Sequence, residues 1–134
     1  MKTVISNLKK ASVLAVAILV LTVSTNVVVS PQSVGASSAC VSNVYYYGRS
    51  GACVSYLQHM LNGIGRFYNY KGYDSLSTDG QFGSRTRGQV YNYQWFANLK
   101  GDGIVGPMTW HSLCYDAYNR VGGEAADYGR RAGC

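Results

Sequence analysis

Acidic residues are scarce in this sequence. Only six Asp and Glu residues stand against 12 Lys and Arg, and Glu124 is the single glutamate. Glycoside hydrolysis usually needs two facing carboxyl groups, one of them protonated. Because Glu124 lies in a glycine-flanked stretch near the C-terminus, we do not expect a glycosidase.

Histidine is equally rare, which bears on metal chemistry. A zinc amidase or endopeptidase needs two or three His ligands, whereas the chain holds only His59 and His111. Calcium sites need several oxygen ligands at alternating positions, and neither Asp79 nor Asp102 has a second carboxylate close by. We therefore predict no metal site and no cofactor.

Long apolar runs are absent except near the N-terminus. Residues 11–23 are apolar apart from two hydroxyl residues, and three lysines with no acid precede them. A basic segment before an apolar run too short to span a membrane comfortably is typical of a signal peptide. We predict a signal peptide over residues 1–36, with cleavage after Ala36, or after Ala39 as second choice. A retained N-terminal anchor is the alternative.

Residues 37–134 would then form one small exported domain. Loss of the three leader lysines leaves nine basic residues against six acidic ones, a mild excess that indicates no partner alone. The basic residues are scattered, and only Arg130 and Arg131 adjoin, so nucleic-acid binding is not expected. We expect a secreted monomer with no stable membrane anchor.

Four cysteines all fall in the predicted mature part. An even count in a small exported chain predicts two disulfides, and no close C-x-x-C pair suggests zinc. We prefer Cys53–Cys114, because one residue precedes a predicted helix and the other follows one, which leaves Cys40–Cys134 to link the termini. The sequential pairing, Cys40–Cys53 with Cys114–Cys134, is the alternative.

A short repeat organises the rest of the sequence. Residues 79–86 and 102–109 both read D-G-x-apolar-G-x-x-T. Asp-Gly favours a tight turn, and Pro107 suits the first position of a helix, so each copy predicts a turn, an apolar anchor and a helix start. The residues given this structural role, together with one tryptophan of the last helix, are Asp79, Gly80, Phe82, Gly83, Thr86, Asp102, Gly103, Val105, Gly106, Thr109 and Trp110.

Apolar spacing predicts three short helices. The first runs from Val54 to about Gly63 on a stripe with helical spacing. The second starts at Ser84 and the third covers residues 107–113. The stretch 65–77, rich in aromatic residues and broken by glycines, predicts a loop. The last twenty residues predict a loose or partly helical tail held by Cys134.

Three blocks of the sequence carry one pattern of glycine, apolar, glutamine and Asp-Gly positions. They are Gly48-x-x-Gly51-x-x-Val54-x-x-Leu57-Gln58-x-x-Leu61, Asp79-Gly80-x-Phe82-Gly83-x-x-Thr86-x-x-x-Val90-x-x-Tyr93-Gln94, and Asp102-Gly103-x-Val105-Gly106-Pro107-x-Thr109-Trp110-x-x-Leu113. Together they resemble the peptidoglycan-binding domain of bacterial wall hydrolases over residues 48–114. Two departures are the long loop 65–77 and Gly88, which weakens the second helix by about 1 kcal/mol relative to Ala.

This resemblance implies an all-α fold, a small three-helix bundle with long loops. It divides the predicted mature chain into an N-terminal segment (37–47), the peptidoglycan-binding domain (48–114) and a tail (115–134) tied by a disulfide. It also implies a cell-wall partner, peptidoglycan. Since tyrosine offers an apolar body and a polar tip to sugars and peptides, we predict a binding site bordered by Tyr68, Tyr70, Tyr73, Tyr93 and Gln94. Tyr93 and Trp110 as buried core residues are the alternative.

The remaining residues are too few for a second, catalytic domain. We therefore expect a non-catalytic secreted protein that binds peptidoglycan. One alternative is a secreted interaction or inhibitor protein that uses the same bundle and its aromatic loop against a protein partner. Another is a small lytic enzyme without a recognised pattern.

Overall fold

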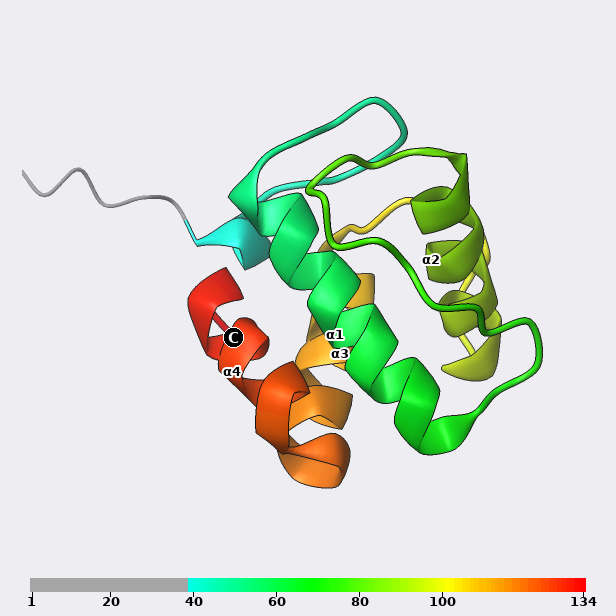
Figure 1. Cartoon of the computed structure of the whole chain (residues 1–134), viewed down its shortest axis with the longest axis vertical. Helices are drawn as coiled ribbons and strands as arrows, with labels where there is room; N and C mark the ends of the chain where they lie inside the picture. Colours follow the sequence, from blue (N-terminus) through cyan, green and yellow to red (C-terminus); the bar gives the residue numbers. More distant parts are fainter. Residues whose placement is uncertain (1–38) are drawn as a thin grey trace, which may run out of the picture. The chain divides into compact units, whose positions relative to one another are not determined.

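The computed structural model describes residues 39–134, and the predicted signal peptide (1–36) lies outside this part (Figure 1). Within it, the chain forms four α-helices and no strand, which confirms the predicted all-α fold. A 3-10 turn (Cys40–Ser42) precedes them, and a π-helical turn (Ala117–Val121) joins the last two. The helices are α1 (Ala52–Tyr68), α2 (Ser84–Phe96), α3 (Pro107–Asp116) and α4 (Gly123–Ala132).

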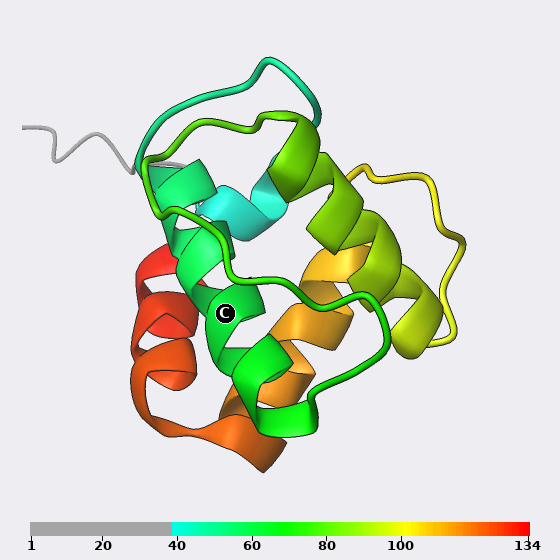
Figure 2. The ribbon, with the colours of Figure 1, turned by 45° about the vertical axis from the view of Figure 1, so that its right-hand side comes forward.

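Helix α1 lies at the centre of the described part and is longer than predicted (Figures 1 and 2). Its predicted apolar stripe is buried, but the helix continues past Gly63 to Tyr68. Glycine at positions 63 and 65 allows close approach instead of ending the helix, because an added Cβ would lie 2.8 Å from Ala125 and 2.0 Å from the Tyr73 ring. The helix ends where Asn69 adopts a left-handed conformation, with φ of 45°.

The core lies between α1, α2 and α3. Phe82 and Val105, the apolar residues of the two repeat copies, are both buried in it. Helices α2 and α3 begin directly after Gly83 and Gly106, whose extended backbone precedes the first helical turn. Each copy of the repeat therefore forms a corner that anchors a side chain in the core and starts a helix, as predicted.

The tail contains a complete helix that the sequence predicted only in part. Helix α4 packs along α1, and this is the most extensive helix–helix contact in residues 39–134 (Figure 1). Its buried face consists of small residues, among them Ala125 and Ala132. Alanine and glycine allow the two helices to approach closely, but they give a weak apolar pattern in the sequence.

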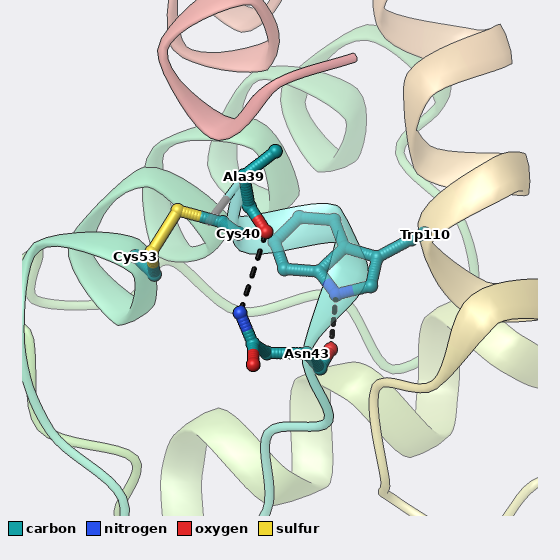
Figure 3. The surroundings of a disulfide bond; sticks show 5 residues. All are labelled: Ala39, Cys40, Asn43, Cys53 and Trp110. Atoms are coloured by element: carbon teal, nitrogen blue, oxygen red, sulfur yellow. Dashed lines mark hydrogen bonds between the residues drawn. A yellow bond between two sulfur atoms is a disulfide. The ribbon is translucent and has the colours of Figure 1, made fainter. Parts of the chain in front are cut away.

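The predicted disulfide pairing is wrong, and the sequential alternative is the one observed. Cys40 pairs with Cys53, and Cys114 pairs with Cys134. The cause is that α4 turns back and brings Cys134 beside the last turn of α3, while the N-terminal 3-10 turn places Cys40 beside the start of α1 (Figure 3). Each bond closes a loop of 13 or 20 residues, which stabilises the fold by about 3 kcal/mol in the chain-entropy estimate.

The N-terminal segment is also attached to α3. The indole Nε1 of Trp110 donates a hydrogen bond of 3.1 Å to the Asn43 carbonyl (Figure 3), and Tyr45 forms a two-bond bridge with Val105. Trp110 is 1% exposed, so it belongs to the core. None of the helices in residues 39–134 combines the length and the apolar character that a membrane span requires.

Candidate functional site

Each corner is closed by one buried glutamine from the preceding helix. In the first corner, Gln58 of α1 is 1% exposed. Its Nε2 donates to Asp79 Oδ1 (3.1 Å), the Gln81 carbonyl (3.0 Å) and Thr86 Oγ1 (3.1 Å), and its Oε1 accepts from the Gly80 amide (2.9 Å). One side chain therefore joins the Asp-Gly turn, the residue before the apolar anchor and the first turn of α2.

The second corner repeats this arrangement around Gln94 of α2. Its Nε2 donates to Asp102 Oδ1 (3.0 Å), the Ile104 carbonyl (2.9 Å) and Thr109 Oγ1 (3.1 Å), while Oε1 accepts from the Gly103 amide (2.9 Å). The predicted site residue Gln94 is thus buried and hydrogen bonded within the protein, and its contacts are those of a structural residue.

The aspartates of the corners also stabilise their own turns. Oδ1 of Asp79 accepts the Gln81 amide and Oδ1 of Asp102 accepts the Ile104 amide, each at 2.9 Å. The bond from the Gln81 amide, helped by the one from Gln58, lowers the pKa of Asp79 below its usual 3.8. The glycines that follow, Gly80 and Gly103, have φ of 72° and 70°, a conformation that favours glycine.

Sequence reasoning missed the role of Gln58. The signal was present, because Gln58 and Gln94 end the same pattern, Val-x-x-Leu-Gln at 54–58 and Val-x-x-Tyr-Gln at 90–94. A buried amide that recurs before each Asp-Gly turn predicts a clamp on that turn.

The five residues predicted to border a binding site do not form one surface. Tyr93 is completely buried, and its hydroxyl donates to Asp116 Oδ2 (2.9 Å) and lies 2.8 Å from Ser112 Oγ. It cannot contact a polymer from this position, so the alternative interpretation as a core residue is correct. Burial raises its pKa.

The tyrosines at residues 68–73 have different surroundings. Tyr68 is the last residue of α1, not a loop residue, and its ring lies 4.8 Å from that of Phe96. Tyr73 is half-buried and covers Gly65. Tyr70 is only 7% exposed, and its hydroxyl, in this described part, has no hydrogen-bond partner within the protein. Burial raises its pKa as well.

Exposed aromatic surface lies instead on the outward face of α2. Tyr91 is 43% and Trp95 is 63% exposed, and their ring centroids lie 6.2 Å apart. They follow each other at a spacing of four residues, so they occupy one side of the helix. We call this outward side the α2 face; it comprises Ser84, Arg87, Gly88, Tyr91, Asn92 and Trp95.

Two hollows border the α2 face. The Gly88 hollow, of about 370 Å³, is lined by Tyr47, Ser84, Arg87, Gly88 and Tyr91. The Tyr70 hollow, of about 450 Å³, is lined by Tyr70, Lys71, Gly72, Asn92, Trp95 and Phe96. Both volumes fall in the range of ligand pockets, about 300–1,000 Å³.

A further hollow, of about 510 Å³, lies at the second corner beside Lys100 and Met108. Its inner polar residues are Gln94, Asp102 and Thr109, which hydrogen bond to one another. A matching hollow of about 210 Å³ lies at the first corner beside Gln58, Asp79 and Thr86. Since the buried polar groups of both corners are satisfied internally, the corners are explained by folding alone.

Comparison with known proteins gives a family match. Residues 50–113, from the start of α1 to most of α3, match the family described as "Putative peptidoglycan binding domain". The matched segment is just under half of the 134-residue chain and contains both corners. The family is found in cell-wall hydrolases. A comparison with curated proteins gives no match.

Several solved structures are similar to this chain over about half of its length. A peptidoglycan-binding protein from Clostridioides difficile, solved with glutamine hydroxamate, is 36% identical over 55% of this chain and 41% of its own, with a TM-score of 0.45. A Burkholderia AP3 phage endolysin is 38% identical over 53% of this chain and 24% of its own, with a TM-score of 0.46. The SleB N-terminal domain is 33% identical over 54% of this chain and 89% of its own, with a TM-score of 0.45. The chain thus spans under half of the first two proteins.

Proposed function

We propose that this protein is an exported, non-catalytic protein that binds cell-wall peptidoglycan through residues 50–113. The observation that carries the proposal is the family match over α1, both corners, α2 and most of α3. The two glutamine clamps and two disulfides support it, because they hold a small domain rigid and so reduce the entropy that binding costs.

Export is supported by the cysteines and by the leader-like N-terminus. In residues 39–134 all four cysteines are paired, and disulfides of this kind persist mainly in oxidising compartments. A basic segment followed by a short apolar run precedes this domain in the sequence.

Glu124, the single glutamate of the sequence, is engaged in contacts within the domain. His59 Nδ1 lies 2.8 Å from Glu124 Oε1, and its ring stacks on Tyr128 with centroids 3.7 Å apart. Glu124 also pairs with Arg66 at 3.1 Å. In the described part, no three of the His, Cys, Asp and Glu residues are grouped so that they could hold a metal ion.

The test is co-sedimentation of the oxidised protein with purified insoluble peptidoglycan. We expect the protein in the pellet, and no release of dye from dye-labelled walls. The matched control is the same protein with both disulfides reduced, which we expect to bind less because the rigid domain is weakened. Protein that stays in the supernatant would refute the proposal and favour a protein partner, and dye release would show an enzyme.

A further inference from the structure

We propose that the α2 face binds the glycan chain of peptidoglycan, with the rings of Tyr91 and Trp95 stacked on the apolar faces of its sugars. This inference rests on the proposed function and specifies its ligand. Of the five residues predicted to border a site, it keeps Tyr70 as part of the Tyr70 hollow and leaves out Tyr93 and Gln94, which are buried.

The α2 face exposes large flat side chains. Trp95, on the α2 face, shares with Tyr47 the highest exposure of any described aromatic residue, 63%. Aromatic and arginine side chains dominate binding energy when a ligand covers them. Sugar rings present flat apolar faces with hydroxyl and amide groups around them, so they fit exposed rings flanked by polar groups. Arg87, Ser84 and Asn92 supply such groups on the same helix side.

Gly88, in the middle of α2, has no packing reason to be glycine. A glycine inside a helix costs about 1 kcal/mol relative to alanine, and here no packing contact requires it, because an added Cβ would meet no atom within 4 Å. Its effect is to leave space between Tyr47 and Tyr91, where the Gly88 hollow lies. Folding does not explain the residue, whereas a ligand that enters this space does.

Two buried polar atoms near the Tyr70 hollow lack a hydrogen-bond partner within the described residues. The hydroxyl of Tyr70 and the Oε1 of Gln89 are buried without a hydrogen-bond partner within residues 39–134. Both residues are at least nine-tenths buried. Gln89 donates through Nε2 to the Gly72 carbonyl at 3.0 Å, and Gly72 and Tyr70 line the hollow. Unsatisfied buried polar groups are uncommon, so this wall of the Tyr70 hollow is a place where folding alone leaves hydrogen bonds unmade.

Charge also fits a glycan ligand. Where the stem peptides have been removed, the muramic acid units of the glycan expose carboxylates, and two cations without an acidic partner lie beside the two hollows. Within the described residues, five Lys and Arg residues form no ion pair: Arg49, Lys71, Arg87, Lys100 and Arg131. Of these, Lys71 lines the Tyr70 hollow and Arg87 lines the Gly88 hollow. Each hollow therefore has one positive charge on its wall.

The spacing of the hollows indicates a chain and not a single sugar. Gly88 and Trp95 are two helical turns apart, about 10 Å along the axis at 1.5 Å per residue. A ligand that reaches both hollows must therefore be an oligomer. We expect affinity to rise with the number of sugars until both hollows are occupied.

The experiment is calorimetric titration of the oxidised protein with two separate probes, soluble glycan chains stripped of peptides and free stem peptides. We expect binding to the glycan probe alone. Trp95→Ala and Tyr91→Ala should each weaken it roughly tenfold, as for a central aromatic contact. The matched control is Tyr115→Ala, because Tyr115 is an exposed tyrosine of α3 that lines neither hollow.

Gly88→Leu makes the test independent of folding. Leucine favours the helix and its side chain would fill the Gly88 hollow, so the thermal midpoint should not fall while glycan affinity drops roughly tenfold. Sedimentation with intact walls separates the two proposals. If the wild-type protein binds walls but the three α2 variants bind as strongly, or if only stem peptides bind, the glycan inference is wrong and the proposed function stands. If the wild type does not bind walls, both fail.

Discussion

The two corners of this domain have the same interior and different surroundings. In both, a buried glutamine holds an Asp-Gly turn and the threonine of the next helix, with matching bonds of 2.9–3.1 Å. The connections that lead to them differ. The first corner follows the long segment 69–78, whereas the second follows α2 after only a few residues.

This difference shows which part of the longer connection the fold needs. Since the short connection supports the same clamp, the long one is not needed to build a corner. Its residues have two other roles. The Leu76 amide donates a hydrogen bond to Asn62 Oδ1 on α1 (2.8 Å), and Asn62 Nδ2 donates one to the Leu76 carbonyl (2.9 Å). Residues 70–72 form one wall of the Tyr70 hollow. The long segment is therefore fixed along α1 (Figure 2) and adds surface next to α2.

The clamps give the largest predicted effect. Gln58→Ala and Gln94→Ala each leave a buried glycine amide without its acceptor and remove three hydrogen bonds donated by the glutamine amide, so each should reduce the free energy of unfolding by about 3 kcal/mol. Urea denaturation of the oxidised protein measures both. Near-equal losses would show that the corners are energetically equivalent; a loss below about 1 kcal/mol at either would contradict the clamp.

The turn glycines should distinguish the corners. Gly80→Ala and Gly103→Ala both place a side chain at positive φ, which costs about 1–2 kcal/mol. At Gly80 the new Cβ would lie 3.0 Å from the rigid Gly51 carbonyl, but at Gly103 it would meet the flexible side chain of Arg87 at 2.8 Å. We expect the larger loss at Gly80. Thermal midpoints of the two variants provide the measurement, and a larger loss at Gly103 would be the contrary result.

Much of this fold follows from sequence pattern, and the exceptions share a cause. The corners were predictable because Asp-Gly restricts the backbone locally, and the stripe through Val54 and Leu57 because it repeats with helical spacing. The full extent of helix α4 and the disulfide pairing were not predictable, because α4 depends on close packing of Ala125 against Gly63. Small residues carry little periodic signal, and the disulfide pairing follows from where α4 places Cys134.

The exposure of the predicted site residues was mispredicted for a related reason. Aromatic residues in a glycine-rich stretch favoured residues 68–73, but whether a ring is exposed depends on packing that the sequence leaves open. Tyr70 turned inward. The position of Trp95 could have been predicted: the inner stripe of α2 through Val90 and Tyr93 places residues 91 and 95 on the outer side.

Asp79 gives the smallest effect, and it concerns pH. Its pKa is lowered in the folded protein by the bonds from the Gln81 amide and Gln58, so the carboxylate stabilises the fold above its unfolded pKa of about 3.8. That contribution is lost as the pH falls through the lower, folded pKa. We expect wild-type unfolding midpoints in urea to decline between about pH 5 and about pH 2 more steeply than those of Asp79→Asn. Because the asparagine oxygen can still accept the Gln81 amide, the two proteins should converge at the acid end. Parallel curves over the whole range would mean that this carboxylate does not contribute to the stability of the first corner.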